Sequence, residues 1–190
     1  RTNHHLFQPL LYQVATAGLS APAIAAPVRY VFRRQANVTT LLGEVVGIDA
    51  QRRLVHLKDD APLPYDHLVV AAGATHSYFG NDGWAAFAPG LKTLDDAFEI
   101  RRRILLAFET AEKAADPALR EPWMTFVVIG GGPTGVEMAG TLAEIARQTL
   151  PGEFRRIDPS QARVLLLEGS PRVLQSMPED LSVRACEQLS

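Results

Sequence analysis

The amino-acid sequence predicts an α/β fold, and three observations support this prediction. A short apolar strand turns through a run of glycines into a helix, within Phe126–Ala146. A second apolar strand, Arg163–Glu168, follows that helix and ends in an acidic residue. Further strand-like segments lie between residues 41 and 72, and the first two are predicted to form a small antiparallel meander. Alternation of strands and helices is typical of α/β folds with a parallel sheet.

Within the first of these units, three glycines have the G-x-G-x-x-G spacing of a dinucleotide-binding loop. Gly130 permits the tight turn, Gly132 lets the backbone approach a pyrophosphate, and Gly135 lets the helix pack closely on its strand. Free N–H groups and the positive end of the helix dipole favour an anion at this position. The candidate cofactor-binding loop is completed by Gly131, Pro133 and Thr134.

The context of the glycines supports this interpretation. Phe126–Ile129 is apolar and rich in β-branched residues, as a buried strand should be. Pro133 suits the first helical position, because its missing N–H costs nothing there. The alternative is a Rossmann-like unit whose glycines serve only packing. The following residues have apolar side chains at helical spacing on one face: Val136, Ala139, Leu142 or Ala143, Ala146 and Leu150.

A dinucleotide site of this kind also needs an acid about 20 residues after the glycines, to hold the ribose hydroxyls. Glu168 lies 33 residues after Gly135, and without the polar 12-residue insert Leu150–Gln161 the separation is 21. The insert is predicted to be a surface loop. An acid here accepts hydrogen bonds from the ribose but repels a 2′-phosphate, so NAD(H) is favoured over NADP(H). Arg172 lies close enough to accommodate a 2′-phosphate, which leaves that preference open.

Composition narrows the classes of function. The chain has 190 residues, of which 47% are hydrophobic and 21% charged, which is typical of a globular protein of one or two domains. Its net charge is −2 and no basic run alternates with aromatic residues, so no nucleic-acid partner is expected. No apolar stretch reaches the roughly 18 residues of a membrane span.

Cysteine and histidine usage gives no sign of a disulfide pair or a metal site. Cys186 is the single cysteine, so the chain has neither an internal disulfide nor a Cys-x-x-Cys pair. It falls in a predicted helix and is interpreted as an inert packing thiol. His4 and His5 are adjacent and the other three histidines are scattered, so no metal site is predicted.

Three helical segments are predicted before the glycine motif. His5–Thr16 has helical spacing at its centre, and Ala21–Arg34 is predicted to be a short helical region broken by prolines. A long helix should begin after Thr93, its N-cap, with Asp96 completing a weak capping box. The apolar stripe of the long helix is predicted to consist of Ala97, Ile100 or Arg101, Ile104, Phe108 and Ala111.

Three strand-like segments lie between these helices. Leu41–Asp49 and Arg53–Lys58 are separated by a plausible turn beginning at Asp49, and therefore predict a meander. The third segment, within Tyr65–Ala74, is continuous and apolar, so we expect a buried parallel strand. It ends in small residues, where a backbone could approach a ligand closely.

These stretches together resemble the type II NADH dehydrogenases, which are single-subunit NADH:quinone oxidoreductases carrying FAD. The resemblance covers nearly the whole chain and includes the insert before Glu168. Against the length of the family, the first FAD-binding glycine motif and the membrane anchor are expected to lie outside this sequence. The matching stretches are Asn3–Ala15, Asn37–Asp49, Leu63–Gly80, Leu91–Glu112, Phe126–Glu144, Arg156–Leu174 and Met177–Ser182.

The resemblance implies an α/β fold of two Rossmann-like dinucleotide-binding domains, both incomplete here, with the small antiparallel β-meander in the first. Residues 1–90 would be the remnant of the FAD-binding domain. Residues 91–123 would form a connecting helix and linker. Residues 124–190 would be the first half of the NAD(H)-binding domain.

The resemblance also implies roles for four residues outside the glycine loop. Val45 lies where the family's backbone meets adenine, and Ala72 and Gly73 lie beside the phosphate and ribitol of the flavin. A purely structural role is the alternative for these three. Glu137 is implied to lie beside the nicotinamide as a catalytic residue, where it could orient NADH or relay a proton. Its alternative is an acid in the first turn of the helix, where the helix dipole favours it.

The function implied is transfer of a hydride from NADH to FAD, followed by transfer of electrons to a membrane quinone without proton pumping. The implied protein belongs to a respiratory chain and lies on the cytoplasmic, inner face of a bacterial cell membrane. Segments outside this sequence would hold it there, and a homodimer is allowed. Two alternatives stay open: a thiol/disulfide-type or other NADH-dependent flavoprotein reductase of the same fold, or, for this chain alone, a non-catalytic nucleotide-binding fragment.

Overall fold

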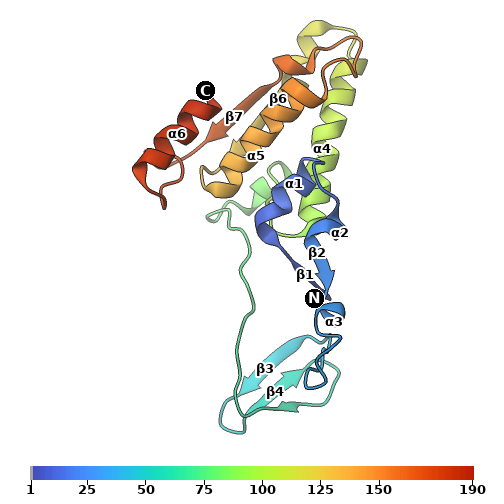
Figure 1. Ribbon diagram of the computed structural model, residues 1–190, viewed down its shortest axis with the longest axis vertical. Helices are drawn as coiled ribbons and strands as arrows, with labels where there is room; N and C mark the ends of the chain where they lie inside the picture. The colour runs from blue at the N-terminus through green and yellow to red at the C-terminus, as the bar shows by residue number, and fades with distance from the viewer. Residues whose placement is uncertain (1) are drawn as a thin grey trace. The chain divides into compact units, whose positions relative to one another are not determined.

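The computed structural model describes residues 2–190, which divide into two compact units (Figure 1). The first unit comprises the residues up to 7 and residues 22–75. The second comprises residues 8–21 and 76–190. The chain passes for the last time from the first unit to the second between residues 75 and 76. The sequence, by contrast, predicts that the FAD-binding remnant ends at residue 90. That expected boundary concerns the complete protein and stays a prediction.

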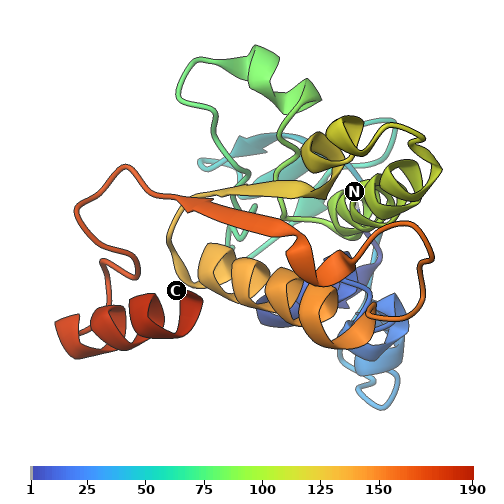
Figure 2. The ribbon, with the colours of Figure 1, turned by 90° about the horizontal axis from the view of Figure 1, so that it is seen from above.

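The second unit contains the predicted strand–turn–helix–strand motif. Strands β6 (Thr125–Ile129) and β7 (Arg163–Leu167) are parallel and paired in register, from Thr125 opposite Arg163 to Ile129 opposite Leu167. Helix α5 (Pro133–Glu144) connects them and lies alongside both strands (Figure 2). It continues as one π-helical turn over Ile145–Thr149. Of the predicted apolar face, Ala139, Leu142 and Ala146 are buried, and Met138 is buried with them.

The insert between α5 and β7 is a surface loop, as predicted, and it is attached to helix α4 (Leu94–Lys113). The Glu112 carboxylate accepts hydrogen bonds from three successive backbone N–H groups, at residues 155, 156 and 157, with distances of 3.1, 2.9 and 3.1 Å. Burial alone would raise the pKa of Glu112, but these three hydrogen bonds outweigh it and hold the pKa below its ordinary value. This attachment lies at the amino end of β7, away from the glycine loop.

Helix α4 begins with a complete reciprocal capping box, stronger than the weak one expected. The Thr93 hydroxyl accepts a hydrogen bond from the Asp96 N–H at 3.2 Å, and the Asp96 carboxylate accepts one from the Thr93 N–H at 2.8 Å. The predicted stripe is confirmed, because Ala97, Ile104, Phe108 and Ala111 are the buried residues of the helix. Phe108 packs against Phe126 of β6, with ring centroids 5.2 Å apart. The core of this unit thus joins α4 to the small sheet.

Helix α6 (Glu179–Leu189) follows β7 and contains Cys186. The interpretation of Cys186 as a packing thiol is wrong, because the residue is exposed. The buried residues of the helix are Ser182 and Ala185. At 3.6 residues per turn, position 186 is rotated by about 100° from position 185 and so leaves the buried face.

The first unit contains the predicted meander. Strand β3 (Val45–Asp49) pairs antiparallel with β4 (Leu54–Leu57), and β4 pairs with the two-residue strand β5 (Leu63–Pro64). The turn between β3 and β4 is held by Asp49, whose carboxylate accepts hydrogen bonds from the N–H groups of Gln51 and Arg52 at 3.0 and 2.8 Å. The predicted turn is therefore confirmed.

The predicted buried parallel strand within Tyr65–Ala74 is wrong for this structure. These residues form no strand, and the side chains of Val69 and Val70 are 87% and 68% exposed. A strand in a parallel sheet needs neighbouring strands to complete its backbone hydrogen bonds. No strand among residues 2–190 pairs with this segment. Apolar composition alone therefore does not place it in a sheet.

The beginning of the chain is less helical than predicted. Strand β1 (His4–Leu6) pairs antiparallel with β2 (Ala25–Pro27), a pair that the sequence did not reveal. Helix α1 (Leu11–Ala15) belongs to the second unit, and its buried residues Leu11, Val14 and Ala15 lie in the core. Two short helices, α2 (Ala21–Ile24) and α3 (Val28–Val31), flank β2.

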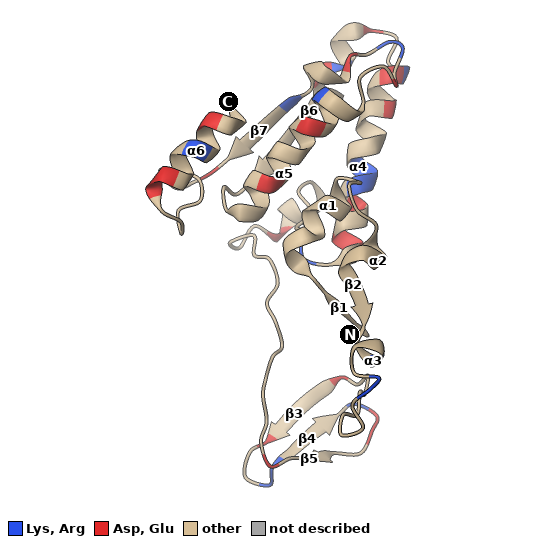
Figure 3. Cartoon of the chain, viewed as in Figure 1, with Lys and Arg blue, Asp and Glu red and all other residues tan. Residues whose placement is uncertain are grey.

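Charged residues of both signs are interspersed along α4 and α6 (Figure 3). Among the described residues, no helix has both the length and the apolar character required to cross a bilayer.

Candidate nucleotide-binding site

The glycine loop joins β6 to α5 with the backbone geometry that its sequence predicts. Gly130 has a φ of +103°, in the left-handed region that favours glycine, and its N–H donates to the Leu167 carbonyl at 2.8 Å. A Cβ atom at Gly135 would overlap the carbonyl oxygen of Gly130, so the helix can start this close only without a side chain. A Cβ at Gly132 would meet nothing within 4 Å, so the space beside this residue is open.

The amino end of α5 offers unpaired hydrogen-bond donors. Gly132 is the N-cap, and Pro133 occupies the first turn. Within residues 2–190, no hydrogen bond satisfies the N–H groups of Gly132, Thr134 and Gly135, and the first bonded N–H is that of Val136, which donates to the Gly132 carbonyl at 3.0 Å. Three unpaired donors and the positive end of the helix dipole therefore lie at the start of α5, an arrangement suited to a phosphate group.

Glu168 follows β7 directly and lies against the glycine loop. One carboxylate oxygen accepts a hydrogen bond from the Gly131 N–H at 2.5 Å, and the other accepts one from the Ser170 N–H at 2.7 Å. The hydrogen bonds from Ser170 and then Gly131 hold the pKa of Glu168 below its ordinary value. The carboxylate is thus ionised at neutral pH, and its remaining lone pairs can accept hydrogen bonds from the ribose hydroxyls.

Gly131 is bonded through both its N–H and its carbonyl to residues that follow β7. Its N–H donates to Glu168, and its carbonyl accepts a hydrogen bond from the Leu174 N–H at 2.7 Å. Gly131 is buried, and a Cβ there would lie 3.0 Å from both a Glu168 oxygen and a Val173 methyl. Sequence reasoning missed the part played by Leu174, because a contact between two backbone groups leaves no side-chain signature.

Arg172, the residue that left cofactor choice open, is bonded to backbone carbonyls of its own loop. Its guanidinium donates to the carbonyls of Gln175 and Met177, each at 3.0 Å, and more weakly to that of Leu174 at 3.4 Å. Two of its three guanidinium nitrogens are occupied in this way.

Glu137 lies in α5, two residues after the last glycine of the loop, and is exposed. Its carboxylate makes no hydrogen bond within residues 2–190, and partial burial raises its pKa above the ordinary value. A carboxyl group with this environment holds a proton more readily than the ionised Glu168. Its proximity to a nicotinamide stays a prediction.

The three residues expected to contact FAD lie in the first unit. Val45 begins β3, is paired with Leu57 and is 55% exposed. Ala72 lies in the irregular segment after the meander. Gly73 follows it with a φ of +76°, and a Cβ there would meet nothing within 4 Å. No hydrogen bond joins Val45 to either residue, whereas hydrogen bonds do connect Glu168 to the nucleotide loop.

Within the described part of the chain, no three His, Cys, Asp or Glu side chains gather closely enough to hold a metal ion.

Comparison with known proteins gives a consistent set of relatives. Residues 1–190 match the family described as pyridine nucleotide-disulphide oxidoreductase. The chain is 55% identical to the type II NADH:quinone oxidoreductases Ndh and NdhA of Mycobacterium tuberculosis, with all of this chain and 42% and 41% of those proteins aligned. It is 34% identical to the mitochondrial external alternative NADH-ubiquinone oxidoreductase of Yarrowia lipolytica, over 94% of this chain and 32% of that protein.

Solved structures agree with the sequence relatives. The structure of NDH2 from Plasmodium falciparum in complex with NADH superposes with a TM-score of 0.84 at 25% identity, over 98% of this chain and 39% of that one. The sulfide:quinone oxidoreductase of Aquifex aeolicus shares the fold alone, with a TM-score of 0.70 at 17% identity, over 98% of this chain and 42% of that one. The α/β fold class and the resemblance seen in the sequence are confirmed. The chain spans about two fifths of the length of its curated relatives in Mycobacterium.

Proposed function

The chain belongs to the pyridine nucleotide-disulphide oxidoreductase family, and on that premise we propose that it is part of a type II NADH:quinone oxidoreductase. The complete protein would use FAD to pass a hydride from NADH into the enzyme and electrons on to a membrane quinone, without pumping protons. The support is the 55% identity over the whole chain to two enzymes of that name. Since the chain spans about two fifths of those relatives, the activity is that of the complete protein.

The observation that carries the proposal is the contact between the glycine loop and Glu168. The unpaired N–H groups at the start of α5 would bind the pyrophosphate of NADH. Glu168 would accept hydrogen bonds from the hydroxyls of the adenosine ribose, and its negative charge would repel a 2′-phosphate. The hydrogen bond of 2.5 Å between the Gly131 N–H and the Glu168 carboxylate holds the glycine loop beside an ionised acid, an arrangement that fits one dinucleotide and favours NADH over NADPH.

The residues of this chain would contribute binding and orientation, while the cofactors supply the redox chemistry. Bound FAD would provide the acceptor for the hydride of NADH. Among the described residues there is no second glycine-rich loop that could hold its pyrophosphate, so Val45, Ala72 and Gly73 would supply only part of its site. Glu137, whose pKa is raised by partial burial, would orient the nicotinamide or relay a proton.

A thiol/disulfide-type reductase of the same fold is less well supported. Such enzymes exchange electrons through a pair of cysteines. The cysteine of this chain, Cys186, lies on α6 and not on the glycine loop. The sequence relatives that match over the whole chain carry the name NADH:quinone oxidoreductase.

An assay of the full-length protein separates these two functions. NADH oxidation should be measured with a soluble quinone and, in parallel, with disulfide and peroxide acceptors. We expect the quinone to support much faster turnover than either of the others. Preference for a disulfide acceptor would contradict the proposal.

Because a quinone is dissolved in lipid, we further propose that the complete protein binds peripherally to the cytoplasmic face of the cell membrane; a homodimer is allowed. The anchor would be an amphipathic helix outside residues 1–190. Cells expressing the full-length protein and a version ending at Ser190 should be fractionated. The full-length protein should pellet with membranes and the shortened version should not, whereas equal pelleting would place the anchor within this chain.

A further inference from the structure

The segment between β7 and α6, residues 168–178, has no regular secondary structure, yet its backbone is held at several points. We call it the β7–α6 loop. Arg172 donates to the carbonyls of residues 174, 175 and 177, which closes the second half of the loop around its guanidinium. Ser182 of α6 donates from its hydroxyl to the Val173 carbonyl at 2.6 Å.

Both of these interactions act on the residues next to Leu174. Its neighbour Val173 is fixed to α6 by Ser182, a side chain that is only 2% exposed. Leu174 itself has a φ of +51° and is 9% exposed, so it is buried in a backbone conformation that a branched residue rarely adopts. Such a conformation persists only where surrounding contacts enforce it. Arg172 and Ser182 are the polar side chains that supply those contacts.

The conformation of Leu174 has a direct consequence for the nucleotide site. Its N–H points at the Gly131 carbonyl, 2.7 Å away, while the N–H of the same glycine is bonded to Glu168. The Gly131 residue is therefore held at its N–H and at its C=O by two positions of one loop. Loss of the Leu174 bond would leave Gly131 held to this loop by its N–H alone, so the glycine loop would be positioned less rigidly against Glu168.

On the basis of the function proposed above, we propose that Arg172 and Ser182 are positioning residues for nucleotide recognition. They hold Leu174 against Gly131 and so keep the glycine loop and Glu168 in the arrangement that receives the pyrophosphate and the ribose. Arg172 is then a clamp of the β7–α6 loop and not a receptor for a 2′-phosphate. Its substitution should weaken NADH and NADPH equally.

The test uses the full-length protein with Arg172→Ala, Arg172→Lys and Ser182→Ala. Arg184→Ala is the matched control, because Arg184 is exposed on the neighbouring helix α6 and its side chain makes no hydrogen bond or ion pair within residues 2–190. The measurements are KM and kcat with NADH and with NADPH, and the affinity for ADP-ribose by calorimetry. ADP-ribose carries the pyrophosphate and both riboses but undergoes no hydride transfer.

Arg172→Ala should raise KM for NADH about tenfold, as expected from losing hydrogen bonds to a charged group, with kcat changed less than about twofold. KM for NADPH should rise by the same factor, and the affinity for ADP-ribose should fall in parallel. Ser182→Ala should act in the same direction by about threefold, since its bond is between neutral groups. Arg184→Ala should change none of these values.

The Arg172→Lys variant distinguishes a positioning role of Arg172 from a role as a receptor for a 2′-phosphate. A lysine keeps the positive charge but cannot reach three carbonyls with a planar fork, so the clamp predicts that this variant is impaired with both nucleotides. A receptor for a 2′-phosphate predicts the opposite: Arg172→Ala would lose NADPH selectively, and Arg172→Lys would restore it. That result would overturn the proposal.

The calorimetric measurement keeps this inference separate from the proposed function. If the wild type transfers no electrons from NADH to a quinone, the proposed function fails, but the clamp is still tested by ADP-ribose affinity. If Arg172→Ala and Ser182→Ala both bind ADP-ribose with unchanged affinity, the positioning role is contradicted, whichever electron acceptor the enzyme uses. Absence of ADP-ribose binding by the wild type would overturn the nucleotide site on which the positioning role of Arg172 and Ser182 depends.

Discussion

The Glu168 carboxylate accepts a hydrogen bond from the Gly131 N–H at 2.5 Å, although the two residues are 37 positions apart in the sequence. One residue belongs to the turn after β6 and the other to the end of β7, two strands that are paired in parallel. Parallel pairing brings their carboxyl ends to the same edge of the sheet, which is where α/β proteins bind ligands. The contact thus places the expected phosphate site beside the expected ribose site.

The third glycine of the loop should tolerate no side chain. Gly135→Ala would drive a Cβ into the Gly130 carbonyl, so we expect loss of ADP-ribose binding and a clear drop in the free energy of unfolding. Gly140→Ala, on the same helix, is the matched control, because its Cβ would meet only a Leu189 methyl at 4.0 Å. That change should be neutral or stabilise the protein by about 0.5–1 kcal/mol. Wild-type binding by Gly135→Ala would contradict the loop geometry.

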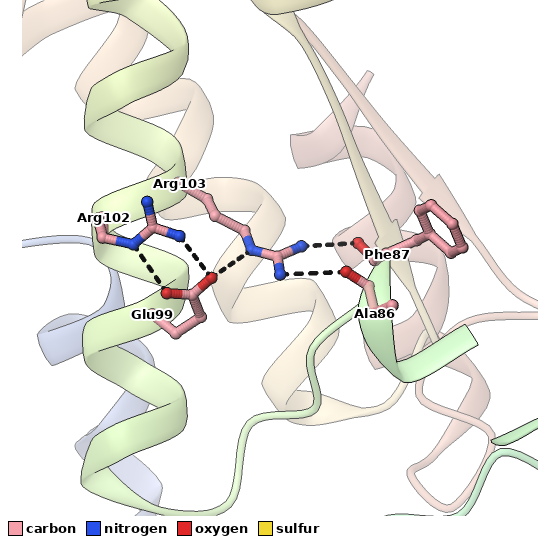
Figure 4. A network of polar contacts seen from close by, with 5 residues as sticks. All are labelled: Ala86, Phe87, Glu99, Arg102 and Arg103. Atoms are coloured by element: carbon pink, nitrogen blue, oxygen red, sulfur yellow. Dashed lines mark hydrogen bonds and ion pairs between the residues drawn. The ribbon is translucent and has the colours of Figure 1, made fainter. Parts of the chain in front are cut away.

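A charged network on α4 should make stability depend on acidic pH (Figure 4). Glu99 accepts hydrogen bonds from Arg102 at 2.8 Å and Arg103 at 2.7 Å, and these lower its pKa from 4.5 to about 2. Arg103 also donates to the carbonyls of Phe87 and Ala86 at 3.1 and 3.2 Å. Because the folded-state pKa is depressed, the stabilisation is present above pH 4.5 and is lost as the pH falls towards 2.

The measurement is the unfolding midpoint of the wild type and of Glu99→Gln as a function of pH. The difference between the two should be constant near neutrality and should shrink below pH 4.5. A difference that grows on acidification would contradict the assigned direction of the pKa. High salt should reduce the difference at neutral pH, since the network lies at the surface.

The core of the second unit should depend strongly on Phe108. This side chain is 2% exposed and packs against Phe126 at 5.2 Å and Phe154 at 6.1 Å between ring centroids. Phe108→Ala should lower the free energy of unfolding by about 3–5 kcal/mol. Leu106→Ala, on the same helix but 48% exposed, should change it by less than about 0.5 kcal/mol. Equal effects in a denaturant titration would show that α4 does not pack on the sheet as described.

The parts of the fold that the sequence predicted correctly are those with a local pattern. The capping box at Thr93 and the buried stripe of α4 follow from the spacing of a few residues in one helix. The glycine loop is similarly local, since Gly130 must have a positive φ and Gly135 must lack a side chain. Parallel pairing of β6 with β7 followed from the single helix that connects them.

Features that depend on distant partners were missed or mispredicted. The apolar segment that includes Val69 forms no strand, because hydrophobicity indicates burial but does not supply the neighbouring strand. The β1–β2 pair has strands of three residues, too short to show alternation. The bond of Leu174 to Gly131 joins two backbone groups far apart in the sequence, and backbone groups are offered equally by any sequence.

The isolated chain should be nearly inactive as a redox enzyme. The described residues contain one glycine-rich nucleotide loop, at Gly130–Gly135, and the enzyme proposed here needs sites for two dinucleotides. Purified residues 1–190 should therefore carry little FAD and show negligible NADH oxidation. A flavin absorption spectrum with one FAD per chain would contradict this expectation.

The most direct test of the account is nucleotide preference before and after Glu168→Gln, measured as kcat/KM for NADH and NADPH in the full-length protein. Glutamine keeps the shape of the side chain but removes the charge that repels a 2′-phosphate. The wild type should prefer NADH, and Glu168→Gln should reduce that preference about tenfold or more, equivalent to losing one charge-assisted interaction. Equal use of both nucleotides by the wild type, or an unchanged preference in the variant, would contradict the assignment of Glu168 to the ribose.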